Sequence, residues 1–452
     1  MLSSTVTVNL PKTRKTLSLD PLIELVHQRA VALPDWRKGS VTYTMADAVM
    51  SAMAMFSLKD EALLRFEERR NDENLKQIYR IGAVPSDTRM REILDPLSPD
   101  SIRPMFNDVF AQLQRGGALR PYRFQGHYLL SVDGTGYFTS KNVNCQSCLE
   151  KKNKKTGEVT FHHQMLGAAM VHPDQKQVIP FAPEPIVKQD GENKNDCERN
   201  AAKRLLTKIR DEHPHLKLII VEDALASNAP HIRLLKRLRM HFILGAKPDD
   251  HQHLFDEVIR AGDEERFESL RFQHPTHPDI SCEISFVNDL PLNKSNADVR
   301  VNFLQYIEYD PEGGERLRFS WVTDLPITRA NACELVRGAR SRWRIENETF
   351  NTLKNQGYQF EHNFGHGNIN LSVVFAMLMM LTFLVDQAQE LCCPLFQAVR
   401  KKWSSRRAVW DHIRSHFRHF LFDSMEQLYQ VILTDAAKEL PISILFSKPP
   451  SI

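Results

Sequence analysis

The sequence lacks a hydrophobic run of membrane-spanning length and a secretory leader. Its best membrane candidate, VVFAMLMMLTFLV at residues 373–385, is shorter than the roughly 20 residues a transmembrane helix needs, so a buried core helix is expected. The start, MLSSTVTVNLPKTRKTL, has no apolar stretch behind a basic segment, which argues against secretion. Seven cysteines, an odd number in 452 residues, fit a reduced cytoplasmic protein better than a disulfide framework.

Strong net charge is also missing, because 59 Lys and Arg nearly balance 56 Asp and Glu and leave a net charge of +3. The basic residues are instead concentrated in four clusters, at residues 151–155, 236–239, 337–344 and 400–418. A solvated surface explains each cluster taken alone. Four of them in one chain strengthen the alternative, a protein that binds phosphate groups.

The composition, with 42% hydrophobic and 25% charged residues, is that of a folded soluble protein, and the length predicts more than one domain. We find no internal repeat and no low-complexity linker. Changes in pattern divide the chain into five parts: an α-helical N-terminal domain (1–118), the first part of an α/β core (119–247), a β-strand insertion (248–325), the second part of the core (326–392) and a basic helical tail (393–452).

The N-terminal part shows helical spacing of apolar residues in ADAVMSAMAMFSL and IRPMFNDVFAQLQRG. Between them, VPSDTRMREIL begins with an N-cap cluster and then presents Arg89 and Arg91 in its first turns. A DNA-reading helix and a surface helix of a small bundle both fit this pattern.

The core reads as strands GHYLLSVDGTGYF, FHHQMLGAAMVH and QVIPFAPEPI, a helix at 195–214, strand LKLIIVEDALASN, helix APHIRLLKRLRM and strand HFILGAK. The order βββαβαβ resembles that of the RNase H-like core. Four alternating segments within residues 248–325 then predict an antiparallel insertion.

This strand order predicts that two acidic residues lie close together. Asp133 is expected at the end of the first strand and Asp223 at the end of the fourth, and RNase H-like order places those strands side by side. Two carboxylates in one place repel, and a divalent cation allows both to stay ionised. Oxygen ligands favour Mg²⁺ or Mn²⁺. Glu222 alternates to the other face and is expected to be structural.

An RNase H-like site needs a third carboxylate, from a helix after the last strand. The segment SRWRIENETFNTLKNQGY at residues 341–358 offers Glu346 and Glu348, which about 100° per residue places on different faces. Glu348 shares its side with Arg344 and Thr352, toward solvent. Glu346 shares a side with residues suited to pack on the sheet, and we therefore favour it: Arg342, Trp343, Phe350 and Leu353.

These features resemble bacterial insertion-sequence transposases of the DDE type, in the group with a β-rich insertion and a Tyr-Arg-Glu-Lys signature. Arg342 and Glu346 in RWRIE match the signature, whereas its Tyr position is Ala339. The Lys is expected where Leu353 stands, and Lys354 is one residue further on. One extra residue in a helix is absorbed by a π-bulge. We therefore predict such a bulge between Glu346 and Lys354.

The resemblance implies two Mg²⁺ or Mn²⁺ ions held by Asp133, Asp223 and Glu346, and DNA cleavage and strand transfer at transposon ends. Its partners would be double-stranded DNA, as terminal inverted repeats and as target, and a second copy of the chain, in the bacterial cytoplasm at the nucleoid and not at a membrane. Arg342 and Lys354 would hold phosphate oxygens, and Trp343 or Trp321 would stack on a flipped base. The other candidate DNA contacts are Arg89, Arg91, Lys401, Lys402, Arg406 and Arg407.

Alternatives remain. A DNA-binding protein with the same fold and no catalysis, a non-transposing RNase H-like nuclease, and a hydrolase of the glycosidase type all use parts of this pattern.

Cys145 and Cys148 form a single CxxC, with His162 and His163 downstream. Neighbouring residues on a strand face opposite sides, so only three zinc ligands are evident there. His362 and His366 in EHNFGHG fit either a DNA contact or a glycine-rich turn.

Overall fold

The computed structural model describes residues 15–188, 196–403 and 405–434. The predicted leader-free start (residues 1–14) and the end of the predicted basic tail (435–452) lie outside the described residues. The contacts divide the chain into two compact units. The first comprises Met1–Ala118, Ser140–Cys148 and Thr352–Ile452, and the second comprises Leu119–Thr139 and Leu149–Asn351. The five-part division stays a prediction, although one unit boundary falls after Ala118, where the sequence pattern changes.

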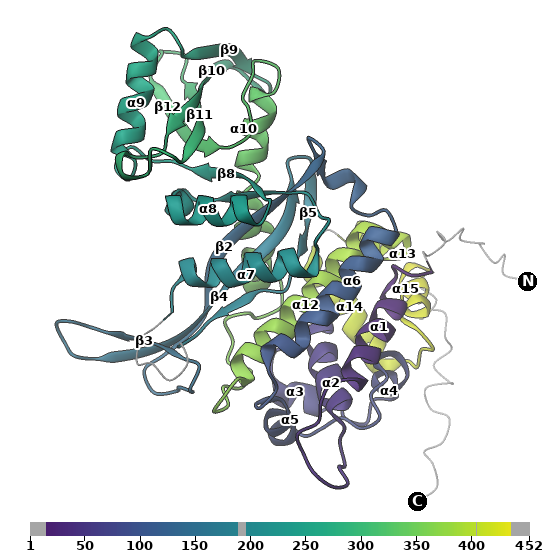
Figure 1. The fold of residues 1–452 in the computed structure, drawn as a ribbon. Coiled ribbons are helices and arrows are strands. Elements are labelled where there is room, and N and C mark those ends of the chain that lie inside the picture. The colour runs from purple at the N-terminus through teal and green to yellow at the C-terminus, as the bar shows by residue number, and fades with distance from the viewer. Residues whose placement is uncertain (1–14, 189–195, 404, 435–452) are drawn as a thin grey trace, which may run out of the picture. The chain divides into compact units, whose positions relative to one another are not determined.

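The first unit is helical (Figure 1). Its helices come from both ends of the chain: α1 (Leu19–Val31), α2 (Met45–Ser57), α3 (Leu63–Glu67), α4 (Glu73–Tyr79), α5 (Asp87–Leu94), η1 (Pro99–Ile102), α6 (Arg103–Arg115), α12 (Leu371–Cys392), α13 (Pro394–Lys402), α14 (Arg406–His419) and α15 (Met425–Thr434). The long helix α12 packs against α1, α2, α5 and α6. N-terminal and C-terminal segments therefore share one core.

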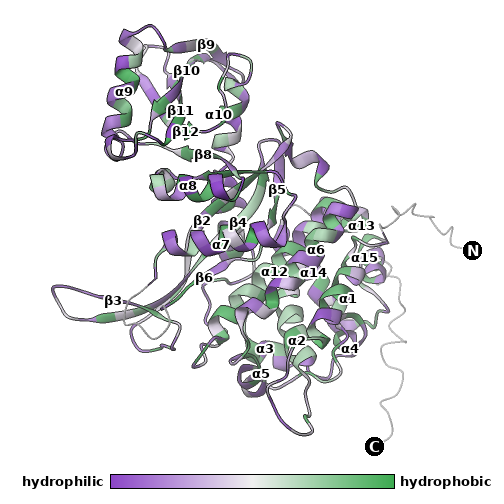
Figure 2. Cartoon of the chain, viewed as in Figure 1, coloured by the Kyte–Doolittle hydropathy of each residue, from purple (hydrophilic) through white to green (hydrophobic). Residues whose placement is uncertain are grey.

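Helix α12 corrects one expectation and supports another. It has 22 residues, so it is long and apolar enough to cross a membrane, and the argument from a short apolar run was wrong. Its most apolar window is nevertheless fully buried, as expected of a core helix. Figure 2 shows it as hydrophobic along most of its length.

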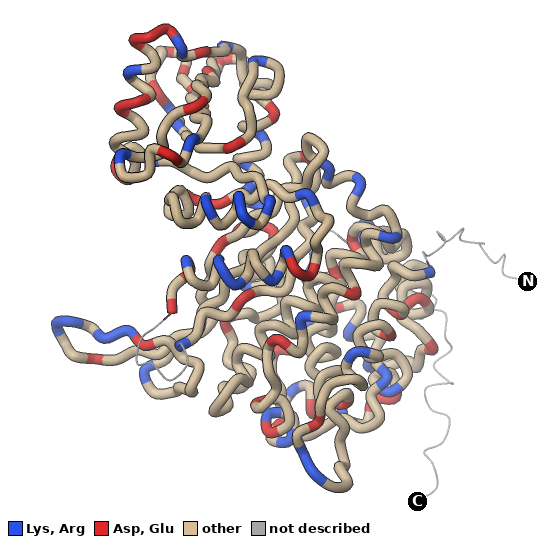
Figure 3. Tube along the Cα trace, viewed as in Figure 1, with Lys and Arg blue, Asp and Glu red and all other residues tan. Residues whose placement is uncertain are grey.

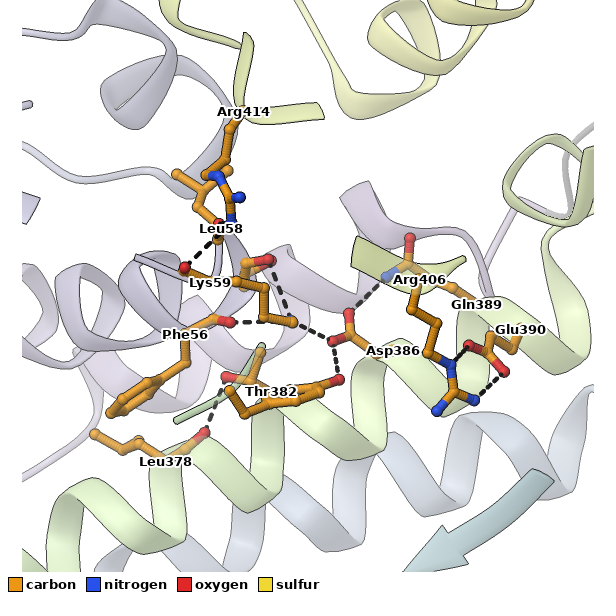
Figure 4. A network of polar contacts seen from close by, with 12 residues as sticks. Phe56, Leu58, Lys59, Leu378, Thr382, Asp386, Gln389, Glu390, Arg406 and Arg414 are labelled. Atoms are coloured by element: carbon orange, nitrogen blue, oxygen red, sulfur yellow. Dashed lines mark hydrogen bonds and ion pairs between the residues drawn. The ribbon is translucent and has the colours of Figure 1, made fainter. Parts of the chain in front are cut away.

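A buried ion pair ties the two chain ends together inside this unit (Figure 4). The Lys59 ammonium lies 2.7 Å from a carboxylate oxygen of Asp386, and both side chains are almost completely buried. Lys59 also donates to the carbonyl of Phe56 at 3.0 Å and lies 3.9 Å and 4.1 Å from the ring centres of Tyr358 and Trp410. Burial lowers the pKa of Lys59 and raises that of Asp386, while each partner opposes the shift of the other.

The second unit contains one mixed sheet, in the strand order β3-β4-β2-β7-β8-β12-β11-β10-β9, with β5 and β6 on β4 and β1 on β2. Its strands are β1 (Arg123–Phe124), β2 (His127–Ser140), β3 (Leu149–Lys152), β4 (Val159–His172), β5 (Gln175–Pro180), β6 (Glu184–Ile186), β7 (Leu218–Glu222), β8 (His241–Gly245), β9 (Glu268–His274), β10 (His277–Pro291), β11 (Arg300–Tyr309) and β12 (Glu315–Thr323). The predicted α/β class is confirmed. Strand β2 runs parallel to β7, and β7 parallel to β8, so the predicted neighbours are neighbours.

Helices cover this sheet. They are α7 (Glu198–Glu212), α8 (Ala229–Arg237), α9 (Gln252–Asp263) and α10 (Ala332–Arg340), with the short η2 (Arg120–Tyr122), η3 (Ala224–Ala226) and η4 (Lys294–Asn296). Strands β9 to β12 pair antiparallel and extend the same sheet, because β12 pairs with β8. The sequence reading missed α9, since its apolar residues were assigned to the β-rich segment.

The predicted π-bulge is confirmed. Residues Ile345–Phe350 form a π-helix, which α11 (Asn351–Asn355) continues. The N–H of Asn351 donates to the carbonyl of Glu346, five residues back, which is the π pattern. The wide turn shifts the faces of later residues. Thr352, which an α-helical wheel placed toward solvent, is buried.

Replacing Lys59 by Met should lower the free energy of unfolding by about 3–5 kcal/mol, because it leaves the buried Asp386 without its cation. The double variant K59M/D386L should recover a large part of this loss. Denaturant unfolding of the four proteins of this cycle measures it. A double variant as unstable as the sum of the two single variants would show that the pair is not coupled.

Candidate active site

The site lies in the second unit, where β2 and β7 run parallel. The paired stretch covers Tyr128–Ser131 of β2 and Leu218–Val221 of β7, and an acid follows each stretch at the same edge. Asp223 comes directly after β7, as expected, and its carboxylate caps η3 by accepting from the N–H of Leu225 at 3.0 Å. Asp133 corrects the expectation, since it lies within β2 and not at its end. The strand continues to Ser140 after parallel pairing stops.

The Asp133 carboxylate is held on both oxygens. One accepts from the N–H of Gly134 at 2.9 Å, and the other accepts from the guanidinium of Arg342 at 3.0 Å. The carbonyl of Arg342 in turn accepts a hydrogen bond from the Ser131 hydroxyl at 3.0 Å. The segment before the π-helix is therefore fixed to β2 at two points.

The π-helix packs against β4 and β5. The ring of Phe350 occupies the space beside Gly167 of β4, where an added Cβ would lie 2.9 Å from a ring carbon. Phe350 thus packs on the sheet, as the facing argument predicted. Glu346 lies near enough to Asp133 for its charge to act on that carboxyl. This agrees with the choice of Glu346 over Glu348, which stays a prediction.

The carboxyl groups here are electrostatically strained. Burial raises the pKa of Asp133 to about 6; Arg342 opposes this rise, and the charges of Glu346 and Asp223 add to it. Burial, and then the charge of Asp223, also raises the pKa of Glu198. Several acids share this site, and Arg342 pairs with one of them, Asp133. A bound divalent cation would relieve the repulsion that remains. The donor set, all oxygen, fits Mg²⁺ or Mn²⁺.

A cavity of about 800 Å³ opens beside Asp133 and Asp223. Its wall includes Glu198, at the start of α7, which the sequence reading missed. The Glu198 carboxylate lies so close to Gly134 that an added Cβ there would be 2.3 Å from one of its oxygens. The sequence signal that could have identified Glu198 is an acidic residue at the start of a helix that packs along the sheet. Glu346 is not on this wall.

The other candidate residues are placed as follows. Trp343 is 48% exposed, so the expectation that it packs on the sheet with Phe350 is wrong. The Arg342 guanidinium lies 5.1 Å from its ring centre. Trp321 is only 7% exposed and stacks on Phe319. Trp321 is therefore placed as a core residue. In the first unit, the Lys354 ammonium pairs with Glu361 at 2.9 Å.

The arginines of α5 both make local ion pairs on an exposed surface, Arg89 with Glu92 and Arg91 with Asp87. The basic segment 400–418 is partly structural. Arg406 binds both oxygens of Glu390, and Lys402 donates to the carbonyl of Ile432 at 2.9 Å. Lys401 and Arg407 are exposed. Figure 3 shows a second basic region, at the tip of the β3–β4 hairpin.

Glu222 is buried and its carboxylate lies 2.6 Å from the His231 ring nitrogen, in keeping with the structural role expected for it. Glu222 and His231 nevertheless line the same cavity as Asp133 and Asp223, so the expectation that Glu222 lies on the other face is wrong.

Comparison with known proteins agrees with this arrangement. No curated protein matches the sequence. Residues 125–384 match the family described as "Transposase DDE domain". This match covers more than half of the chain, including both acids at the sheet edge and the π-helix. The chain therefore belongs to the transposases with a DDE domain, which have an RNase H-like fold and use divalent metal ions.

Proposed function

We propose that this transposase cuts DNA at the ends of its element and joins the freed 3′ ends to a target, using Asp133, Asp223 and Glu346 as metal ligands. The observation that carries the proposal is the placement of Asp133 and Asp223 at one edge of the sheet, just beyond the parallel pairing of β2 with β7. The raised pKa of Asp133, to which burial and the charges of Glu346 and Asp223 contribute, agrees with it. Bound Mg²⁺ or Mn²⁺ ions would supply Lewis acidity toward the phosphate and the attacking oxygen.

The protein's own residues would position the DNA. Arg342 donates to one oxygen of Asp133, and its guanidinium has further N–H donors for a phosphate oxygen. Trp343 offers an exposed ring beside Arg342, suited to stack on an unpaired base. It is the stronger of the two tryptophan candidates. Lys354, Arg89 and Arg91 are proposed as phosphate contacts that would exchange their present carboxylate partners for DNA.

Replacing Asp133 or Asp223 by Asn, or Glu346 by Gln, should slow Mn²⁺-dependent cleavage of terminal-repeat DNA by about a thousandfold or more, since metal activation is worth several kcal/mol. Thermal unfolding and DNA binding should be nearly unchanged, because each substitution conserves volume.

The matched control is E348Q, which should keep most of the activity. If E346Q cuts like the wild type while E348Q or E198Q fails, the third ligand is misassigned. If the unaltered protein binds terminal repeats but never cuts them, it is a DNA-binding protein only. Cutting without strand transfer would make it a nuclease.

The affinity of the site for Mn²⁺ should depend on pH, with a midpoint near the pKa of Asp133. Its pKa of about 6 means that the carboxyl is protonated below this pH, and a proton competes with the metal. Mn²⁺ should therefore bind about tenfold more weakly at pH 5 than at pH 7. Calorimetric titration across this range measures the effect.

The variant R342Q provides the sign test. Arg342 lowers the pKa of Asp133, so its removal should move the midpoint above that of the wild type. An affinity that does not change between pH 5 and pH 7, or a midpoint that moves down in R342Q, would contradict the assignment.

DNA affinity should fall steeply with salt, and the double variant K401Q/R407Q should reduce the slope of log K against log salt by about two if both side chains contact phosphate. R406Q should instead destabilise the fold, because the Arg406 side chain is 14% exposed and paired with Glu390. K38Q/K76Q removes the same charge elsewhere on the surface and is the control. An unchanged slope in K401Q/R407Q would assign this segment to solvated surface.

A further inference from the structure

The CxxC turn that the sequence left unassigned lies in the first unit against the loop that follows α11. The N–H of Gln146 donates to the carbonyl of Asn368 at 3.0 Å, and the Ser147 hydroxyl donates to that of Ile369 at 2.8 Å. Cys145 and Cys148 flank these two residues. The turn is therefore fixed to one particular loop by its central residues, with a cysteine on each side.

The same loop carries His366, a buried residue with 7% exposure. The carboxylate of Asp95 anchors the loop by accepting the successive backbone N–H groups of residues 368–371, at 2.9 to 3.0 Å. Burial raises the pKa of Asp95, but these four donors outweigh it and leave the pKa below its usual value. His366 is thus presented from a rigid backbone.

The three side chains converge with distances close to those of a metal site. The sulfur atoms of Cys145 and Cys148 lie 3.8 Å apart, and the Cys148 sulfur lies 3.2 Å from Nε2 of His366. All three ligand atoms lie within 4.8 Å of one another. Tetrahedral zinc with Zn–S of about 2.3 Å places two sulfur ligands about 3.8 Å apart, and sulfur and nitrogen ligands about 3.6 Å apart.

We propose that Cys145, Cys148 and His366 bind a structural Zn²⁺ ion. Two soft sulfur ligands and an imidazole select zinc over the Mg²⁺ or Mn²⁺ expected at the carboxylates. Binding requires both thiols as thiolates and so releases two protons. The N–H of Cys145 donates to the Cys148 sulfur at 3.4 Å, which stabilises the thiolate form. A disulfide does not fit, since bonded sulfur atoms lie about 2.05 Å apart.

A structural zinc site takes four protein ligands, and strand pairing assigns the fourth to His163. Leu149 pairs with His162 at the start of the antiparallel ladder of β3 and β4. Cys148 is the residue before Leu149 and His163 is the residue after His162, so they are the next pair along that ladder. His162 alternates to the other face. The sequence lacked a fourth ligand because His366 is more than 200 positions from the cysteines.

The ion would fix the base of the β3–β4 hairpin, which carries Lys151 and Lys152 on β3 and Lys154 and Lys155 in its turn. Figure 3 shows this end of the hairpin as basic. A two-stranded hairpin that projects from a sheet has few tertiary contacts of its own. A metal bound at its base by residues on both sides would hold the lysines in one orientation. With four protein ligands the zinc ion has no coordination position left open for substrate, so the site is structural.

The test is the metal content of the full-length protein, purified under reducing conditions without chelator. Mass spectrometry should find one zinc per chain. C145S/C148S, H366N and H163N should each lose it, whereas C197S/C333S, which alters two exposed cysteines, should keep it. D133N/D223N should also keep it, which separates this site from the carboxylates and from the proposed catalytic function.

Cobalt exchange and chelation test the site without relying on substitutions that disturb folding. Co²⁺-substituted protein should show thiolate-to-cobalt charge transfer, and a strong chelator should lower the melting temperature of the unaltered protein until zinc is restored. Zinc-free protein with a Cys145–Cys148 disulfide, or zinc that persists in C145S/C148S, would overturn the proposal. Zinc retained in H163N would overturn the assignment of the fourth ligand.

Discussion

The parallel pairing of β2 with β7 is the constraint on which the site depends. Four residues of each strand pair, and each strand then delivers an acid at the same edge: Asp133 from β2 and Asp223 after β7. A shift of one residue in this register would turn Asp133 to the opposite face. The residues of β7 are buried on both faces, so burial alone does not fix this register. The hydrogen bond from Ser131 to the Arg342 carbonyl and that from the Arg342 guanidinium to Asp133 favour the observed pairing, because both depend on which face of β2 these residues occupy.

The charges themselves oppose the fold. Asp133, Asp223, Glu346 and Glu198 crowd one region, and the raised pKa of Asp133 reports the cost. Arg342 offsets part of it without occupying the whole carboxylate, since it uses one oxygen of Asp133. A site built only for stability would pair each acid with a basic group, as Glu222 at the end of β7 is paired with His231 of α8. The excess of negative charge is better explained by a cation that binds from solution.

Much of this arrangement could be predicted from the sequence, because it follows from local pattern. Strand order followed from hydrophobic runs, and the π-helix followed from the spacing between Glu346 and Lys354. What was missed depends on tertiary contacts. Glu198 enters the cavity because α7 packs against β4, and His366 meets Cys148 through a loop anchored by Asp95. Helix α9 was not predicted, because its amphipathic pattern was assigned to the same β-rich segment as the strands around it.

The π-helix explains how one short segment serves several requirements. Arg342 must reach Asp133, Glu346 must face the same carboxyl, and Phe350 must pack beside Gly167. Residues four apart drift by about 40° per step in an α-helix, so the third would leave the common face. A turn with more residues reduces this drift, at the cost of weaker backbone hydrogen bonding. Persistence of such a turn indicates that alignment of these three side chains outweighs the lost helix stability.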